Sequence, residues 1–496
     1  MQLSVVDPTQ RAKTGIHGLD EVLGGGLPRD RLYLVQGEPG TGKTTLALQF
    51  LLEGAAIGER CLYVTLSETR AEIESTARSH GWSLRDIVII ELSALEQTAV
   101  LEQDNTIFES SEVELQETTR RLLQHVRNGE PHRVVIDSLS ELRLLAQSPL
   151  RYRRQILGFK QQFTGMRSTV LFLDDCTADP PDLQLRSLAH GVLQLEQIAM
   201  PYGEDRRRLR VVKVRGVSFC GGYHDFGIRT GGLIVFPRLR ATAPCADFER
   251  SVLPSGVTEL DLLLGGGLDR ATSTLLMGPA GVGKSELATQ FVTAAVKRGE
   301  RAAWFAFDES LATLDARTRG MGLDVSDYVT SGQLELQQVD PAEMGPGEFA
   351  RLAYGMIEQG ARLIVIDSLN GYLNAINDAK LLTMQLHELL TAFAHQGVST
   401  LLIMGQSGPL GSMETPVDVS YLSDTVLLLH YFEAGGRMRK AISVVKRRCG
   451  PHEDTLRELS VTCKGIEIGE PLLDFSGVSS GVPQLVGQSS LLGEMR

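Results

Sequence analysis

The chain of 496 residues has the composition of an ordinary globular protein, with 42% hydrophobic and 22% charged residues, and its length predicts two or three domains. A formal net charge of −12 disfavours non-specific binding to nucleic acid. No apolar run reaches the roughly 18 residues that a membrane span needs, and the six scattered cysteines form no C-x-x-C pair. We therefore expect a cytoplasmic protein without a zinc site or a disulfide framework, which binds neither nucleic acid nor a membrane.

Seven apolar or alternating stretches of the first half predict β-strands, and helical stretches separate most of them. The runs at 133–137 and 169–173 are almost entirely apolar, as expected for parallel strands that helices cover on both faces. Two later strands follow each other closely, which suggests an antiparallel edge. The predicted strands are 32–37, 61–66, 133–137, 169–173, 192–196, 209–214 and 232–236. This alternation predicts an α/β fold with a mostly parallel sheet flanked by helices.

Each half contains one glycine-rich loop of the form G-x-x-x-x-G-K-[ST], at 37–44 and at 278–285, between an apolar strand and a helix-forming run. The backbone N–H groups of such a loop surround the phosphates of a nucleotide, its lysine adds a positive charge, and its Ser or Thr hydroxyl binds Mg²⁺. The sequence therefore predicts two sites for ATP and Mg²⁺. Their predicted phosphate-binding residues are Gly40, Thr41, Gly42, Lys43, Thr44 and Thr45 in the first half and Gly281, Val282, Gly283, Lys284, Ser285 and Glu286 in the second.

The two loops belong to a repeat that spans most of the chain. Lys43 and Lys284 lie 241 residues apart, and the same offset separates the triple-glycine segments before the two loops and also Glu68 from Glu309. Two copies of one P-loop domain in tandem explain a constant offset. We therefore expect a first domain over residues 1–240, a second domain over 245–470, and a Gly- and Ser-rich tail over 471–496 that frays.

An aspartate ends a buried strand in each half, at Asp137 and at Asp367. An acid at the carboxyl end of a central strand, beside a phosphate loop, can hold Mg²⁺ through water. The alternative is that each acid only caps the helix that follows. Because both halves combine the acid with a phosphate loop, we favour Mg²⁺ sites formed by Thr44 with Asp137 and by Ser285 with Asp367.

A glutamate follows the second predicted strand of each half, at Glu68 and at Glu309. Hydrolysis of ATP needs a carboxylate that orients the attacking water from a position across from the phosphate loop. The alternative is a helix N-terminus in which Thr69 or Ser310 makes the cap. We favour the catalytic role for both glutamates.

A pair of basic residues lies on a late strand of each half, Lys213 with Arg215 and Lys446 with Arg448. Alternate residues of a strand share a face, so the two cations of each pair point the same way. Two cations on one face can hold a phosphate, whereas a basic strand can also be no more than a solvated sheet edge. The residues alone leave both interpretations open.

Taken together, these features resemble the KaiC-type circadian clock ATPases, a branch of the RecA-like fold, over nearly the whole chain. The resemblance rests on the triple-glycine segment before each loop, both phosphate loops, the strand-end aspartates, the basic pairs and the stretch at 77–82. It implies two tandem RecA-like domains and a homohexamer of two stacked rings with ATP between neighbouring subunits. It further implies a KaiB-like protein partner, slow hydrolysis in the first ring and Ser/Thr autophosphorylation in the second.

The resemblance also implies roles for individual residues. The two basic pairs would reach the ATP of a neighbouring subunit, like arginine fingers. Further nucleotide contacts are implied for Ser79, Val214, Arg447 and His452. In the second domain, Asp308 would accept the proton of the hydroxyl that becomes phosphorylated.

Three positions depart from the pattern of that family. Ser67 stands where the first of two adjacent glutamates is expected, so the first domain depends on the glutamate that follows. Asp308 is one methylene shorter than the glutamate expected at its position. Tyr421 replaces the threonine acceptor, which leaves Ser420 and Thr415 as candidate phospho-acceptors.

Two other functions are compatible with this fold, because a fold alone does not decide function. A DNA motor would need basic loops around a pore, and the best basic candidate, the run 206–208, is expected to solvate a turn before a strand. A nucleotide-gated scaffold would bind ATP without depending on its turnover. The motifs favour an ATPase and autokinase that acts as a timer or a signalling switch.

Overall fold

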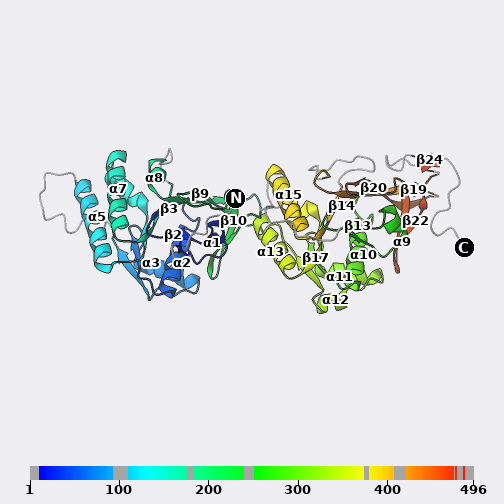
Figure 1. Ribbon diagram of the computed structural model, residues 1–496, viewed down its shortest axis with the longest axis horizontal. Coiled ribbons are helices and arrows are strands. Elements are labelled where there is room, and N and C mark those ends of the chain that lie inside the picture. Colours follow the sequence, from blue (N-terminus) through cyan, green and yellow to red (C-terminus); the bar gives the residue numbers. More distant parts are fainter. Residues whose placement is uncertain are drawn as a thin grey trace. The chain divides into compact units, whose positions relative to one another are not determined.

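The computed structural model divides into two compact units, Met1–Arg238 and Leu239–Arg496. The structure describes residues 11–92, 110–176, 183–239, 251–373, 379–406, 420–434 and 436–473, with two short strands at 475–476 and 484–485. Most of the predicted boundary region and of the predicted tail, and the phospho-acceptor candidate Thr415, lie outside the described residues. Figure 1 shows that each unit combines a β-sheet with helices packed on its faces.

In the first unit, strands alternate with helices as the sequence predicts, and all seven predicted strands are present. The strands are β1 (Arg11–Ala12), β2 (Leu27–Pro28), β3 (Leu32–Gln36), β4 (Cys61–Thr65), β5 (Ile87–Glu91), β6 (Arg133–Asp137), β7 (Thr169–Asp174), β8 (Gly191–Ile198), β9 (Arg206–Val214), β10 (Tyr223–Arg229) and β11 (Gly232–Phe236). The helices are α1 (Leu19–Val22), α2 (Lys43–Ala56), α3 (Arg70–Ser79), α5 (Ser110–Gly129), α6 (Leu139–Ala146), α7 (Pro149–Gly165) and α8 (Leu183–Leu188).

The second unit repeats this succession of elements. Its strands are β12 (Val252–Leu253), β13 (Leu268–Asp269), β14 (Ser273–Gly278), β15 (Arg301–Ala306), β16 (Leu334–Gln338), β17 (Ala361–Asp367), β18 (Ser399–Gly405), β19 (Thr425–Ala434), β20 (Arg437–Arg447), β21 (Arg457–Thr462), β22 (Gly465–Pro471), β23 (Phe475–Ser476) and β24 (Gln484–Leu485). Its helices are α9 (Thr258–Leu263), α10 (Lys284–Lys297), α11 (Leu311–Gly320), α12 (Ser326–Thr330), α13 (Pro346–Glu358), α14 (Leu369–Leu373) and α15 (Ala379–His395).

Each unit is built around a nine-stranded sheet with the same topology. The order is β11-β10-β9-β8-β3-β7-β6-β4-β5 in the first unit and β16-β15-β17-β18-β14-β19-β20-β21-β22 in the second. From β8 to β5, and correspondingly from β19 to β16, neighbouring strands are parallel. The remaining strands add an antiparallel edge. The predicted fold, two tandem RecA-like α/β domains with mostly parallel sheets, is therefore confirmed.

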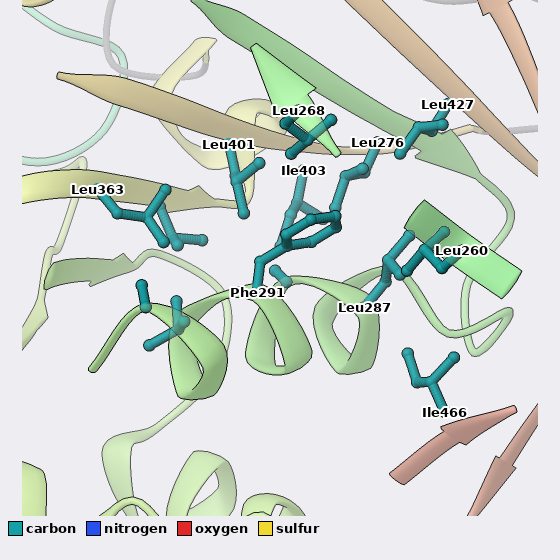
Figure 2. Close-up of a cluster of buried hydrophobic side chains, with 14 of the residues drawn as sticks. Leu260, Leu268, Leu276, Leu287, Phe291, Leu363, Leu401, Ile403, Leu427 and Ile466 are labelled. Atoms are coloured by element: carbon teal, nitrogen blue, oxygen red, sulfur yellow. The ribbon is translucent and has the colours of Figure 1, made fainter. Parts of the chain in front are cut away.

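The helix that follows each glycine-rich loop packs its apolar side against the sheet. In the second unit, Leu287 and Phe291 of α10 point toward the strands (Figure 2). The strand residues of this buried cluster include Leu276, Leu363, Leu401, Ile403 and Leu427. Burial of these side chains is worth about 1.5–3 kcal/mol each. The cluster fixes α10, and with it the loop at its N-terminus, against the carboxyl ends of the strands.

A buried ion pair supports the same helix in the first unit. Arg133 begins β6 with a fully buried side chain, and its Nε lies 2.5 Å from Glu59 Oε2. One of its terminal nitrogens also donates to the carbonyls of Lys13 and Phe50, at 2.7 Å each. Burial alone would raise the pKa of Glu59, but hydrogen bonds from Arg133 and Arg29 lower it overall. The pair therefore stabilises the fold near neutral pH, and its contribution is lost as the pH falls through this lowered pKa.

We predict that Glu59→Gln destabilises the first domain by about 3 kcal/mol, because it leaves the buried Arg133 without its counter-charge. The measurement is urea unfolding followed by fluorescence. The chain has two tryptophans, Trp82 and Trp304, so a Trp304→Phe background reports on the first domain. The matched control is Glu130→Gln, which removes an exposed ion pair with Arg60 and should change stability by less than about 1 kcal/mol. Equal effects of the two substitutions would contradict the prediction.

Candidate nucleotide sites

Both glycine-rich loops join a central strand to the N-terminus of a helix. Gly42 is the N-cap of α2 with φ 95°, and Gly283 is the N-cap of α10 with φ 114°. Both residues adopt the left-handed conformation that favours glycine. A Cβ at Gly42 would also lie 2.5 Å from Cδ1 of Ile228. The glycines are therefore required for this turn, which directs the first N–H groups of the helix toward the loop, an arrangement that favours anions.

The loop lysines fold back over their own loops. Lys43 Nζ donates to the carbonyls of Gly37 and Glu38, at 2.9 Å each. Lys284 Nζ makes the equivalent bonds to Gly278 and Pro279, at 2.9 and 2.7 Å. Both lysine side chains are buried, and burial lowers the pKa of Lys284. Each ammonium group is therefore held against its own loop, the segment that is predicted to bind phosphate.

The strand-end aspartates face the loops and not the helices that follow them. Asp137 Oδ2 accepts hydrogen bonds from Thr44 Oγ1 at 3.1 Å and from the Tyr63 hydroxyl at 2.5 Å. Burial raises the pKa of Asp137, and it raises the pKa of Asp367 to about 6 although the Ser285 hydroxyl opposes this. A hydroxyl and a buried carboxylate side by side are oxygen donors of the kind that Mg²⁺ prefers. The residues present therefore fit the expected ion.

The helix caps beside the candidate catalytic glutamates are made by their neighbours. Thr69 caps α3 in a capping box with Glu72, and Ser310 caps α11 by accepting from the N–H of Thr313. The carboxylates of Glu68 and Glu309 are thus not used for capping. Burial and the nearby Asp137 raise the pKa of Glu68, which is a property of carboxylates that accept protons near neutral pH.

The glutamates and their neighbours have different partners in the two domains. Glu309 forms an ion pair with Arg317, with 2.8 Å between Oε2 and Nη2. Asp308, beside it, accepts a hydrogen bond from the Ser368 hydroxyl. In the first domain, Ser67 replaces this aspartate. The second site therefore has a second carboxylate close to its strand-end aspartate, and its glutamate is held by a cation.

The basic pairs lie at the ends of β9 and β20. Lys213 and Arg215 flank the buried Val214, and Arg215 donates to the Ser187 carbonyl at 2.7 Å. Burial, Arg215 and Lys160 lower the pKa of Lys213. Val214 is buried, whereas Lys213 and Arg215 on either side of it are not, which agrees with the prediction that the two cations share one face.

The second basic pair is bonded to the segment that contains the candidate phospho-acceptor. Lys446 Nζ donates to the carbonyls of Ser420 and Ser423, at 2.9 and 2.6 Å. Arg448 bonds the Tyr421 carbonyl at 2.7 Å and the Asp424 carboxylate at 3.2 Å. The structure therefore brings the basic pair and Ser420 together within one chain.

Other predicted nucleotide contacts lie in different settings. Arg447 has a side chain that is only 4% exposed and pairs with Asp269 at 3.0 Å, so its guanidinium is engaged within its own domain. Ser79 ends α3, where its hydroxyl donates to the Thr76 carbonyl at 2.8 Å. His452 is half-buried in the segment between β20 and β21. The roles of these residues toward a nucleotide stay predictions.

Sequence reasoning missed two charged residues at these sites, Asp175 and Arg317. Asp175 directly follows β7, and its Oδ1 lies 2.9 Å from Lys43 Nζ. Because β7 lies between β3 and β6 in the sheet, the strand-end rule that identified Asp137 could have identified Asp175 as well. Arg317 lies on α11 and Glu309 just before the N-cap of that helix, so only the folded structure reveals their contact.

The basic run 206–208 does not lie in a turn before a strand, as the sequence suggested, but forms the start of β9. Arg208 pairs with Glu196 on β8 at 2.7 Å and lies 4.0 Å from the ring centroid of Tyr223. Cross-strand pairing with an acid and an aromatic ring accounts for this basic residue within the sheet.

In the part of the chain that the structure describes, no helix is long and apolar enough to cross a membrane.

Comparison with known proteins agrees with this architecture. The family model described as "ATPase: KaiC" matches residues 12–240 and 253–472, one match in each domain. The circadian clock oscillator protein KaiC of Thermostichus vulcanus is 29% identical over 487 residues, which cover 96% of this chain and 92% of that protein. The proteins of the same name from Synechococcus elongatus and Nostoc sp. are each 28% identical, cover 95% and 96% of this chain, and are themselves 92% covered.

The family model covers most of the chain, and its two matches coincide with the two sheets and their glycine-rich loops. The full-length similarity to several KaiC proteins follows the same repeat. This chain is therefore a member of the KaiC family of ATPases.

Proposed function

We propose that both domains bind Mg-ATP on their glycine-rich loops and that the chain works as a two-ring homohexameric ATPase whose second domain phosphorylates itself. The observation that carries this proposal is the recurrence of one arrangement in both domains. In each, a buried lysine lies over the loop, and a strand-end aspartate is hydrogen-bonded to the loop hydroxyl. This is the set of groups that phosphoryl transfer requires.

The residues of each site divide the work of phosphoryl transfer. Bound Mg-ATP supplies the phosphoryl group and its leaving group. In the first domain, Lys43 and the N-terminus of α2 bind phosphate charge, while Thr44 and Asp137 would hold the metal. Glu68, with its raised pKa, orients a water molecule and takes its proton.

In the second domain, Lys284, Ser285 and Asp367 play the corresponding parts. Asp308 accepts the proton of the attacking hydroxyl, and Ser420 is the proposed acceptor. The hydrogen bonds from Lys446 to the carbonyls of Ser420 and Ser423 support a link between the acceptor segment and a residue that would contact nucleotide. Because the relatives are named circadian clock oscillator proteins, we further propose a role as a clock component or signalling switch with a KaiB-like partner.

We predict that Lys43→Ala and Lys284→Ala each remove the ATP turnover of one domain, and that the double variant loses at least about 99% of phosphate release. The measurement is steady-state release of phosphate from Mg-ATP. Lys297→Ala, an exposed lysine at the end of α10, is the matched control and should leave the rate unchanged. Turnover that survives in the double variant would contradict the proposed sites.

The autokinase is tested by intact mass and phosphopeptide mapping after incubation with Mg-ATP. We expect one phosphate on Ser420 that is absent in Lys284→Ala and retained in Lys43→Ala. A phosphate on Thr415 would show that the acceptor is Thr415 and not Ser420, while the proposed autokinase activity would be kept. No phosphate in a protein that still hydrolyses ATP would leave an ATPase switch without autokinase activity.

The ion pair between Lys43 and Asp175 leads to a separate prediction for the first site. Hydrogen bonds from Lys43 oppose the effect of burial and lower the pKa of Asp175, so its negative charge competes with phosphate for the lysine. The residue at the corresponding strand end of the second domain is Gly405. The second lysine therefore has no such competitor from this position.

We predict that Asp175→Asn tightens binding of Mg-AMP-PNP to the first site by roughly fivefold, because it removes a charge opposite the phosphates. The asparagine can still bond the Ser140 hydroxyl, which lies 3.1 Å from Asp175 Oδ2. Binding is titrated in a Lys284→Ala background, with Asp86→Asn, an exposed acid, as the control. Unchanged or weaker binding would show that Asp175 does not compete with phosphate.

A further inference from the structure

The two sites differ at two positions that the repeat makes directly comparable. Tyr63 and Thr76 of the first domain correspond to Trp304 and Arg317 of the second. In the first domain, the Tyr63 hydroxyl donates to the strand-end Asp137 at 2.5 Å. In the second, Arg317 lies 5.8 Å from the ring centroid of Trp304. The second domain thus carries a cation where the first has a small neutral side chain.

Arg317 is held in place from several sides. Its Nη2 and Nε donate to the two carboxylate oxygens of Glu309, at 2.8 and 3.3 Å. Its Nη1 lies 3.3 Å from the hydroxyl of Thr289 on α10, which in turn donates to the Ser285 carbonyl at 2.8 Å. The side chains of Arg317 and Glu309 are only 16% and 24% exposed. Glu309 is therefore held by a guanidinium that is itself hydrogen-bonded to α10, the helix that follows the glycine-rich loop.

The ion pair with Arg317 limits the action of Glu309 as a base. A carboxylate that orients water must present a free lone pair in the right direction, and a two-point pair with arginine fixes both oxygens in the plane of the guanidinium. Glu68 has Thr76, not an arginine, at the corresponding position of its domain. Asp308, in contrast to Glu309, is bonded to the hydroxyl of Ser368. The cation therefore restrains one of the two acids of the second site.

We propose that Arg317 is a positioning residue that restrains Glu309 and so slows hydrolysis of ATP in the second domain, in favour of transfer to a protein hydroxyl. In both outcomes the bond between the γ-phosphorus and the bridging oxygen of ADP breaks. In hydrolysis the new P–O bond comes from water and the proton goes to Glu309, whereas in transfer it comes from a serine hydroxyl and the proton goes to Asp308. This inference rests on the proposed roles of Glu309 and Asp308.

The direct test is the substitution Arg317→Thr, which copies the first domain, in a Lys43→Ala background where only the second site turns over. The kcat for phosphate release should rise by roughly tenfold, which is part of the rate acceleration that a well-oriented general base provides. The KM for ATP should stay within about twofold of its original value. The ratio of phosphoserine formed to phosphate released should fall. Arg317→Lys, which keeps the charge but not the two-point geometry, should give an intermediate kcat.

Three further variants separate this effect from general disturbance. Adding Glu309→Gln to Arg317→Thr should return kcat to the value of Glu309→Gln alone. Arg319→Thr removes an exposed arginine of the same helix and should change nothing. In the first domain, Thr76→Arg in a Lys284→Ala background should lower kcat by roughly tenfold.

The outcomes distinguish the inference from the function on which it rests. Suppose that Glu309→Gln lowers the rate of phosphate release at the second site but Arg317→Thr does not raise it. The claim that Arg317 restrains Glu309 is then wrong, while the proposed role of Glu309 is kept. If Glu309→Gln changes nothing, the proposed role of Glu309 fails, and the inference fails with it. Binding of Mg-AMP-PNP shows whether Arg317→Thr folds. If this variant does not fold, Arg317→Gln, which keeps most of the side-chain bulk, takes its place in the same kcat measurement.

Discussion

The parallel register of the central strands is the constraint on which both sites depend. In the first sheet, β3 pairs in parallel with β7, and β7 with β6. The residues that follow these strands therefore meet at one edge of the sheet, where open α/β sheets bind ligands. The loop with Lys43, the acid Asp175 and the end of β6 at Asp137 are separated in sequence but adjacent there. The buried faces of α2 and α10 hold the loops against that edge.

One scaffold carries two different charge arrangements. In the first domain the loop lysine is paired with Asp175, while Glu68 lies near other carboxylates and has a raised pKa. In the second domain a cation, Arg317, pairs with Glu309. The different partners of the first loop lysine and of Glu309 support the proposal that the two domains have different roles. We therefore interpret the repeat as two related sites with divided tasks.

Much of this architecture could be predicted from the sequence because its signals are local. The apolar runs identified the central strands, and the loop pattern identified the turn that Gly42 and Gly283 require. The strand β5 was missed although its sequence, IVIIE, is mostly apolar, and β10 was missed because it carries polar residues. Asp175 could have been found by the strand-end rule, but its pairing with Lys43 depends on β7 lying beside β3. The contact of Arg317 with Glu309 could not be predicted by motif, because it depends on how α11 folds back toward that glutamate.

The most direct test of this account is the number of nucleotides that one chain binds. Equilibrium dialysis with labelled AMP-PNP and Mg²⁺ should give two bound nucleotides per chain in the unmodified protein. It should give one in Lys43→Ala and one in Lys284→Ala. A single nucleotide in the unmodified protein, or two in either variant, would contradict the claim that both glycine-rich loops are nucleotide sites.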